Sequence, residues 1–322
     1  ALKYNPALKV WASPWSPPAW MKYNKHYACS PSNHNDLKPE QAGREGINMF
    51  IQEDAYFKAY SLYFAKFIEA YRKENISIAM VMPQNEFNSC QVFPSCTWLP
   101  SGLNRFVGEY LGPAMKQLGV ELMFGTMERP NPAMVDTLLQ DPKSSPYITG
   151  VGFQWAGKKA ISAIHEKYPN IKLYQTEQEC GNGQNDWKLC CYSWELMKHY
   201  LNNGTNVYDY WNTSLEEGGM SRWGWQQNSL VTVNRENKTC KFTYEYYLLK
   251  HLSHYVLPGA QRLATSGTFT NLLVFRNTDN RYVLIVQNDK DTVIRPSIKI
   301  GEYNIKLILE PNSFNTIVIQ KQ

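Results

Sequence analysis

Two glutamates follow segments that predict buried β-strands. Glu86 ends the peptide Pro-Gln-Asn-Glu after a strand predicted over residues 76–81, and Glu177 directly follows a strand predicted over residues 171–176. The carboxyl ends of parallel strands converge at one mouth of a barrel, so the two side chains should face each other there. Hydrolysis of a glycosidic bond with retention needs one protonated and one ionised carboxyl ~5–5.5 Å apart. We therefore predict that this pair lies at that separation.

Other polar residues near these positions are weaker candidates for chemistry. Asn85, immediately before Glu86, suits a hydrogen bond to the sugar hydroxyl beside the reacting carbon. Glu179 does not end the predicted strand, which separates it from the catalytic candidates. Glu216 and Glu217 lie in a Gly-rich segment that predicts a loop, where a solvated pair of carboxylates is expected.

The sequence contains no motif that would bind a metal or an organic cofactor. The six histidines form no HExxH motif or i,i+4 pair, so we expect no metal site. A Gly-rich phosphate loop and a nucleophile-elbow serine are also missing. We therefore predict a reaction that uses side chains alone, with no cofactor.

Strands and helices alternate along most of the chain, which predicts an α/β protein with a parallel sheet. Strands are predicted over residues 8–13, 76–81, 120–124, 148–153, 171–176 and 207–211. Helices are predicted over residues 54–75, 103–118, 134–140, 159–167, 192–201 and 244–255. About six such units in series indicate a (β/α)8 TIM barrel with two units missing. Because a strand is already in progress at residue 8, we expect the first two βα units to precede Ala1.

The pattern changes after about residue 258, where short runs of alternating apolar residues are separated by turn signals. Such runs are typical of an antiparallel β module. We therefore predict a catalytic barrel domain over residues 1–257, from about the third strand on, and a small β-sandwich-type side domain over residues 258–322.

The overall composition excludes several classes of partner. The net charge is +5 with 19% charged residues and no block of Lys or Arg, so nucleic acid is not an expected partner. No run approaches the ~18 apolar residues of a membrane span, so no integral membrane segment is expected. Aromatic residues reach 14%, and such rings can stack on sugars or fill a core. The seven cysteines are an odd number, so at least one thiol stays free or pairs elsewhere.

Three motifs together carry a resemblance to a known family. They are the peptide SPWSPPAWMK over residues 13–22, Gln-Asn-Glu over 84–86 and Thr-Glu-Gln over 176–178. With them the chain resembles the family 30 glycoside hydrolases, the glucosylceramidase and β-1,6-glucanase group, over nearly its whole length. The resemblance implies a retaining mechanism with Glu86 as general acid/base and Glu177 as nucleophile. It also implies that Trp15 and Trp211 line the wall of the −1 sugar site, with Asn85 beside the acid/base.

The chain departs from the family pattern at several positions. Family members usually carry His-Trp-Tyr where this chain has Gln154-Trp155-Ala156, so a Tyr hydroxyl that would touch the nucleophile is missing. We still predict that Gln154 and Trp155 bind substrate. Phe87 follows the acid/base where Pro is common, and a sugar-binding Asp or Arg of the family would come from strands before Ala1.

These observations predict a retaining O-glycosyl hydrolase that acts on β-linked glucan or glucosides, with β-1,6-glucan the preferred substrate. The alternatives are β-xylosidase or glucosylceramidase-type activity, and a non-catalytic protein that binds carbohydrate at an aromatic barrel mouth. The expected partner is an oligosaccharide, polysaccharide or glycoside. The family resemblance implies a secreted, periplasmic or cell-surface protein, although no signal-peptide pattern opens the sequence.

Overall fold

A computed structural model describes residues 1–320 of the chain. The chain packs into two compact units, and each is described by itself. The first contains residues 1–179, 203–210 and 222–224, and the second contains the rest of the chain. The predicted domain boundary near residue 257 stays a prediction.

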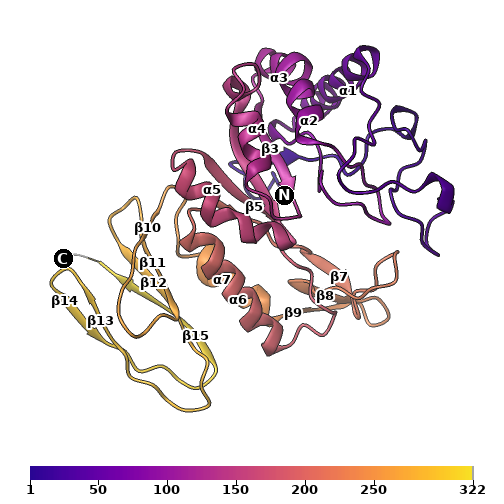
Figure 1. Cartoon of the computed structure of the whole chain (residues 1–322). Helices are drawn as coiled ribbons and strands as arrows, with labels where there is room; N and C mark the ends of the chain where they lie inside the picture. The colour runs from indigo at the N-terminus through magenta and orange to yellow at the C-terminus, as the bar shows by residue number, and fades with distance from the viewer. Residues whose placement is uncertain (321–322) are drawn as a thin grey trace. The chain divides into compact units, whose positions relative to one another are not determined.

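A six-stranded parallel sheet forms the centre of the first unit (Figure 1). Its strands, in spatial and chain order, are β1 (Val10–Ala12), β2 (Ile78–Val81), β3 (Glu121–Met127), β4 (Ile148–Gln154), β5 (Lys172–Glu177) and β6 (Val207–Tyr208). Every neighbouring pair is parallel. The sheet curls, so that the Trp11 side chain of β1 lies close enough to lower the pKa of Asp209, the residue after β6, against the effect of burial. The six barrel strands predicted from the sequence are confirmed.

Helices of the first unit follow the strands as the sequence predicts. They are α1 (Asp54–Lys73), α2 (Pro100–Phe106), α3 (Gly112–Leu118), α4 (Ala133–Leu139) and α5 (Ile161–Lys167). The helix predicted over residues 103–118 is interrupted by a π-helical segment, Val107–Leu111, between α2 and α3. Pro113 is the physical reason, because it has no N–H and therefore cannot continue the regular hydrogen-bond ladder.

Aromatic packing fixes α1 and α2 in place. Phe57 and Tyr60 of α1 are fully buried, as are Phe50, Trp98 and Phe106. The Phe50 ring stacks on Trp98 at 4.5 Å between centroids and on Tyr60 at 5.2 Å. Rings of this size dominate the burial of apolar surface, so Phe57 and Tyr60 of α1 serve the core, whereas Tyr63 and Tyr71 are exposed.

The interior of the curled sheet is lined by methionines. Met80, Met82 and Met123 form a buried cluster, with Trp11 and Tyr174 packed against it. Met82 lies so close to β4 that a Cβ added at Gly152 would come within 2.6 Å of its sulfur. Flexible methionine side chains fill irregular gaps well, which suits the interior of a tightly curved sheet.

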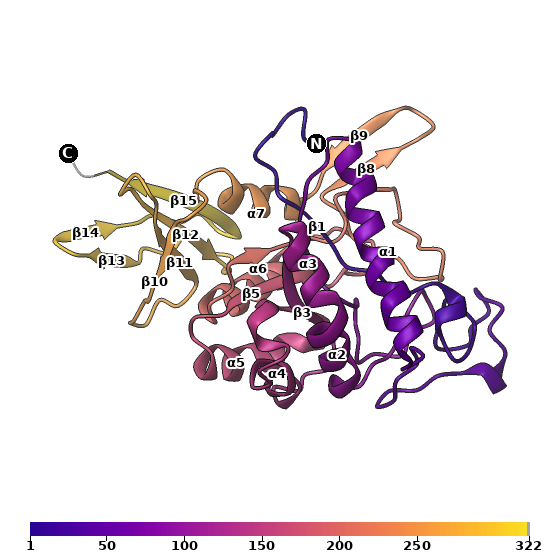
Figure 2. The same cartoon turned by 90° about the horizontal axis from the view of Figure 1, so that it is seen from above.

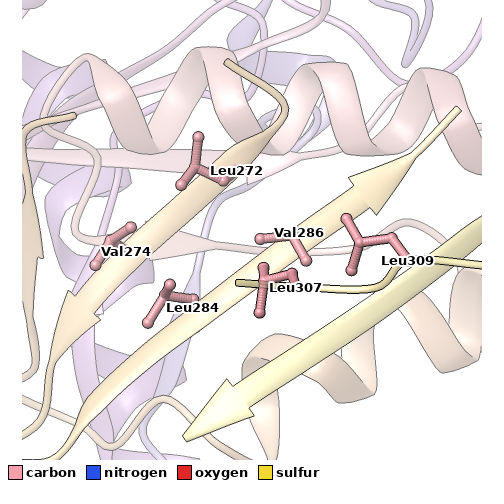
Figure 3. Close-up of a cluster of buried hydrophobic side chains, with 6 residues drawn as sticks. All are labelled: Leu272, Val274, Leu284, Val286, Leu307 and Leu309. Atoms are coloured by element: carbon pink, nitrogen blue, oxygen red, sulfur yellow. The ribbon is translucent and has the colours of Figure 1, made fainter. Parts of the chain in front are cut away.

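The second unit contains α6 (Trp187–Asn202), α7 (Tyr244–Ser253) and three sheets (Figure 2). One sheet is antiparallel, in the order β10 (Gln261–Leu263), β11 (Leu272–Arg276), β12 (Tyr282–Asn288) and β15 (Ser313–Ile319). The hairpin β13 (Ser297–Ile300) and β14 (Tyr303–Lys306) adds a second pair. Figure 3 shows the apolar core of this module, formed by Leu272, Val274, Leu284, Val286, Leu307 and Leu309. The predicted antiparallel β module is confirmed.

Three elements differ from the prediction. A small sheet of β7 (Ser214–Glu216), β8 (Val231–Asn234) and β9 (Thr239–Phe242) was not predicted, and Glu216 therefore ends a strand instead of lying in a loop. α6 begins at Trp187, five residues before its predicted start, because the Trp187 ring packs against Phe314 at 5.3 Å. β6 ends at Tyr208 instead of residue 211. Among the described residues, no helix is long and apolar enough to cross a membrane.

Candidate active site

Glu86 lies in the loop that follows β2, in a constrained backbone conformation. Its φ is +47°, in the left-handed region that costs a non-glycine residue free energy. Its N–H donates a 2.8 Å hydrogen bond to Oγ1 of Thr126 near the end of β3, and Ser89 N–H donates to its carbonyl at 3.0 Å. The side chain is 4% exposed. Backbone strain held by such bonds is typical of functional sites.

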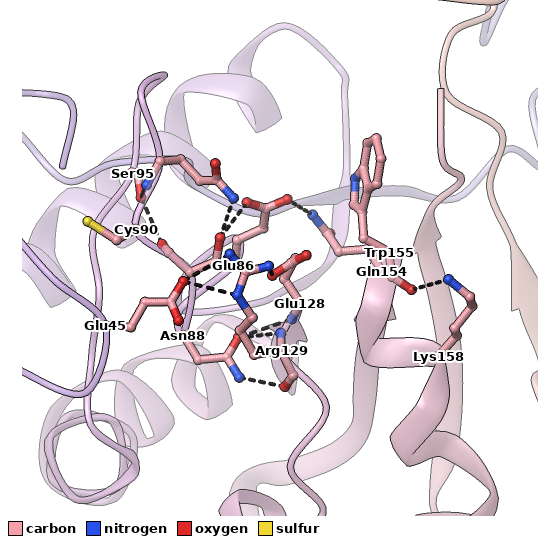
Figure 4. Close-up of polar contacts among 12 residues, drawn as sticks. Glu45, Glu86, Asn88, Cys90, Ser95, Glu128, Arg129, Gln154, Trp155 and Lys158 are labelled. Atoms are coloured by element: carbon pink, nitrogen blue, oxygen red, sulfur yellow. Dashed lines mark hydrogen bonds and ion pairs between the residues drawn. The ribbon is translucent and has the colours of Figure 1, made fainter. Parts of the chain in front are cut away.

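The Glu86 carboxyl accepts two side-chain hydrogen bonds (Figure 4). Nε2 of Gln154 donates to Oε1 at 2.9 Å, and Oγ of Ser89 donates to Oε2 at 3.3 Å. Burial raises the pKa of Glu86 to about 7. The side-chain donors Gln154, Ser89 and Gln91 oppose this rise, and the nearby Glu128 adds to it. A carboxyl with this pKa can carry a proton near neutral pH, as a general acid must.

Glu177 is the last residue of β5 and is 9% exposed. The indole Nε1 of Trp155 donates to its Oε1 at 3.1 Å. Burial raises the pKa of Glu177 to about 8, the Trp155 donor opposes this, and the charge of Glu86 adds to it. The charge of one carboxyl therefore acts on the other, although their predicted ~5–5.5 Å separation stays a prediction.

Two consecutive residues at the end of β4 hold the two carboxyls. Gln154 bonds to Glu86 and Trp155 bonds to Glu177, and β4 is paired with β5 in the sheet. Trp155 has a φ of +49°, and Nζ of Lys158 donates to its carbonyl at 3.2 Å. The strained backbone turns these adjacent side chains toward different partners, so both carboxyls share one edge of the sheet.

The segment over residues 13–22 is bound to the loop that carries Glu86. Asn85 N–H donates to the Pro14 carbonyl at 2.9 Å, and Nε2 of Gln84 donates to the Trp15 carbonyl at 2.8 Å. Asn85 is buried, and its Oδ1 accepts a hydrogen bond from Oγ1 of Thr126 at 3.2 Å. The structure thus brings Trp15 and Asn85 close to the acid/base candidate. Trp211 belongs to the second unit, so its place in the sugar site stays a prediction.

Several residues around Glu86 were not singled out from the sequence. Thr126 and Glu128 lie where β3 ends, and Ser89 follows Glu86 in its loop. Glu128 is buried and forms an ion pair with Arg129, whose Nη2 lies 2.9 Å from Oε1 of Glu45. The rule that functional groups follow barrel strands would have found Thr126 and Glu128 at the third strand. The bond from Gln154 to Glu86 was also not predicted, since we assigned Gln154 to the substrate.

The described residues hold no group of three or more His, Cys, Asp and Glu side chains arranged for a metal ion. Glu179, the alternative to Glu177, forms an ion pair with Lys158. Two buried carboxyls at the carboxyl edge of a curled parallel sheet define the class of barrel proteins that carry an acid/base pair at the mouth.

Comparison with known proteins identifies the family. The model of the glycosyl hydrolase family 30 TIM-barrel domain matches residues 1–256, and the chain belongs to this family. A putative glucosylceramidase 1 of Caenorhabditis elegans is 27% identical over 89% of this chain and 57% of its own length. An endo-1,6-β-D-glucanase of Aspergillus fumigatus is 24% identical over 92% of this chain and 62% of its own length.

A solved endo-β1,6-glucanase has the same fold, with a TM-score of 0.81 and 26% identity over 99% of this chain and 73% of the solved chain. The chain spans less than two thirds of the length of the curated relatives it matches.

Replacing Trp155 by Phe should weaken the ionised state of Glu177. The ring remains, but the N–H that favours the carboxylate is lost, so the pKa of Glu177 rises further. In the pH profile of kcat/KM, the limb set by Glu177 should move to higher pH by about one unit, because one hydrogen bond to a charged group has this magnitude. Trp15→Phe is the control, since it leaves the Trp155 donor in place. An unmoved limb would contradict this role for Trp155.

Proposed function

We propose that the protein is a retaining β-glycoside hydrolase that uses Glu86 as general acid/base and Glu177 as nucleophile. One observation carries the proposal: two buried carboxyls at one sheet edge are each held by a neighbouring residue of β4. Membership of glycosyl hydrolase family 30 supports it. Glu177 attacks the anomeric carbon while Glu86 protonates the leaving oxygen, and Glu86 then activates the water that releases the sugar.

The proposed roles require that Glu86 holds a proton while Glu177 is ionised. Burial raises the pKa of both carboxyls, to about 7 for Glu86 and about 8 for Glu177, so burial alone does not place the proton on Glu86. A difference of one unit is about 1.4 kcal/mol, less than many hydrogen bonds to a charged group. One sugar hydroxyl that donates to Glu177 would therefore move the proton to Glu86. We therefore infer that substrate binding places the proton on Glu86. The Trp155 N–H already favours the charged form of Glu177.

We propose β-1,6-glucan as the preferred substrate, because relatives that align over most of the chain are named as endo-1,6-β-glucanases. Glucosylceramide is the second candidate, since other relatives are named as glucosylceramidases. Both substrates present a β-linked glucosyl unit to the same pair of carboxyls. Secretion or display at the cell surface is proposed from the family alone.

Proton NMR of the first products tests the mechanism and the substrate together. The purified protein is incubated with β-1,6-glucan, glucosylceramide in detergent, and aryl β-glucoside and β-xyloside. Retention predicts that the β-anomer appears first and that the α-anomer follows only by mutarotation. Release of the α-anomer first would contradict the mechanism. Binding of glucan without hydrolysis of any substrate would favour a carbohydrate-binding protein.

A further inference from the structure

A pair of cysteines lies beside the loop that carries Glu86, outside the machinery described above. Cys29 is fully buried and Cys90 is partly exposed, and the two residues are brought together by the hydrogen bond from Cys29 N–H to the carbonyl of Gln91, the neighbour of Cys90. The two residues are 90 − 29 = 61 positions apart in the sequence. Cys90 follows Glu86 by four residues, and its sulfur points away from the Glu86 carboxyl (Figure 4).

The backbone around the pair is held in register by hydrogen bonds. The N–H groups of Cys29 and Ser30 both donate to the Gln91 carbonyl, at 3.0 and 2.8 Å. Ser95 N–H donates to the Tyr27 carbonyl at 3.0 Å. On the other side, Oγ of Ser30 lies 3.3 Å from the Cys90 sulfur and donates to the Cys90 carbonyl at 3.1 Å. These hydrogen bonds hold the segment of Cys29 beside the segment of Cys90.

The buried ammonium group of Lys22 lies close to Cys29. Nζ of Lys22 donates to the carbonyls of Tyr27, Ala28 and Ser95 at 3.0, 3.2 and 2.5 Å. The Cys29 sulfur contacts the same Ser95 carbonyl at 3.3 Å. The Cys90 thiol and the Lys22 charge lower the pKa of Cys29 to about 6 against the effect of burial, which favours the thiolate that thiol exchange requires.

We propose that Cys29 and Cys90 are a redox-active pair that closes into a disulfide between the segment around Lys22 and the loop after Glu86. The oxidant is a low-molecular-weight disulfide such as oxidised glutathione. The Cys29 thiolate takes the proton of Cys90, and the accessible Cys90 sulfur then attacks the oxidant, forms a mixed disulfide and releases one small thiolate. Cys29 gives this proton to the released thiolate and attacks the Cys90 sulfur, which releases the second small thiolate. The protein loses two electrons and one proton, and the small disulfide gains the two electrons and becomes two thiols, the second of which takes its proton from water.

The bridge would fix the loop that positions the acid/base candidate. Ser89, the neighbour of Cys90, donates to the Glu86 carboxyl, and its carbonyl accepts a 3.1 Å hydrogen bond from Ser95. A disulfide that closes a loop of this length removes many conformations from the unfolded chain. Reduction of the oxidised protein should therefore lower its midpoint of thermal unfolding by about 5 °C or more.

Peptide mapping without reduction tests the bridge independently of any catalytic activity. The purified protein is oxidised with glutathione disulfide, its free thiols are alkylated, and it is digested with trypsin. The peptide of residues 26–44 should be joined to that of residues 74–105, and fragment ions should place the bridge at Cys90 instead of Cys96. The exposed Cys240 provides the control, because Cys240→Ser should keep the bridge.

The reductant-dependent unfolding shift should be lost in Cys29→Ser and in Cys90→Ser. If Cys29→Ser does not fold, Cys90→Ser still tests the proposal, because the Cys90 side chain is partly exposed and lies beside the Ser30 hydroxyl. Full alkylation of both thiols after oxidation, or a bridge from Cys90 to another cysteine, would overturn the proposal.

Discussion

Replacing Glu177 by Gln should lower kcat by at least about 10³-fold on every substrate, while the affinity for substrate changes little. The amide has nearly the shape of the carboxyl but cannot attack the anomeric carbon, so no covalent intermediate forms. Trp155 can still donate its N–H to the amide oxygen, which preserves the local structure. Steady-state kinetics and isothermal titration with an intact oligosaccharide measure the two effects separately.

Glu179→Gln is the matched control for this variant. Glu179 is two residues away and paired with Lys158, so its loss should leave kcat within a few-fold of wild type. Activity of Glu177→Gln close to that of wild type, together with a large loss in Glu179→Gln, would show that the nucleophile was assigned to the wrong carboxyl.

The strands that position the site could be predicted because their apolar runs are buried on both faces. β3 and β4 are almost entirely buried, and their predicted positions differ from the observed ones by only a few residues. The small sheet of β7 to β9 could not be found in this way. Its strands have mostly exposed or half-buried side chains, so no alternation of apolar and polar residues marks them.

The positions of Glu86 and Glu177 could be predicted from the ends of strands, but their partners could not. The bond from Gln154 to Glu86 joins residues 68 positions apart, and the geometry depends on a left-handed turn at Trp155. A tryptophan at positive φ has no sequence signature, since bulky residues rarely adopt this conformation. Tertiary contacts stabilise it, so only the structure shows how adjacent side chains serve different carboxyls.

Replacing Glu86 by Gln should have an effect that depends on the leaving group. Hydrolysis of glucan should fall by about 10²–10⁴-fold, because an alkoxide cannot depart without a proton. An aryl glucoside with an acidic phenol needs no proton, so formation of the covalent intermediate should stay close to the wild-type rate. Azide should then speed turnover of that substrate, since this nucleophile replaces the water that Glu86 would activate.

The pH profile gives a second measure of the same variant. Glu86 must be protonated to act as the acid, so loss of its proton should lower wild-type kcat/KM on glucan at high pH, and the pKa raised by burial keeps this limb above the ordinary range of a carboxyl. Glu86→Gln should lose this limb. Glu128→Gln is the matched control because it removes a neighbouring carboxyl and leaves the acid in place, so it should show neither azide rescue nor dependence on the leaving group. An equal loss in Glu86→Gln on glucan and on the activated aryl glucoside would contradict the role of Glu86 as acid/base.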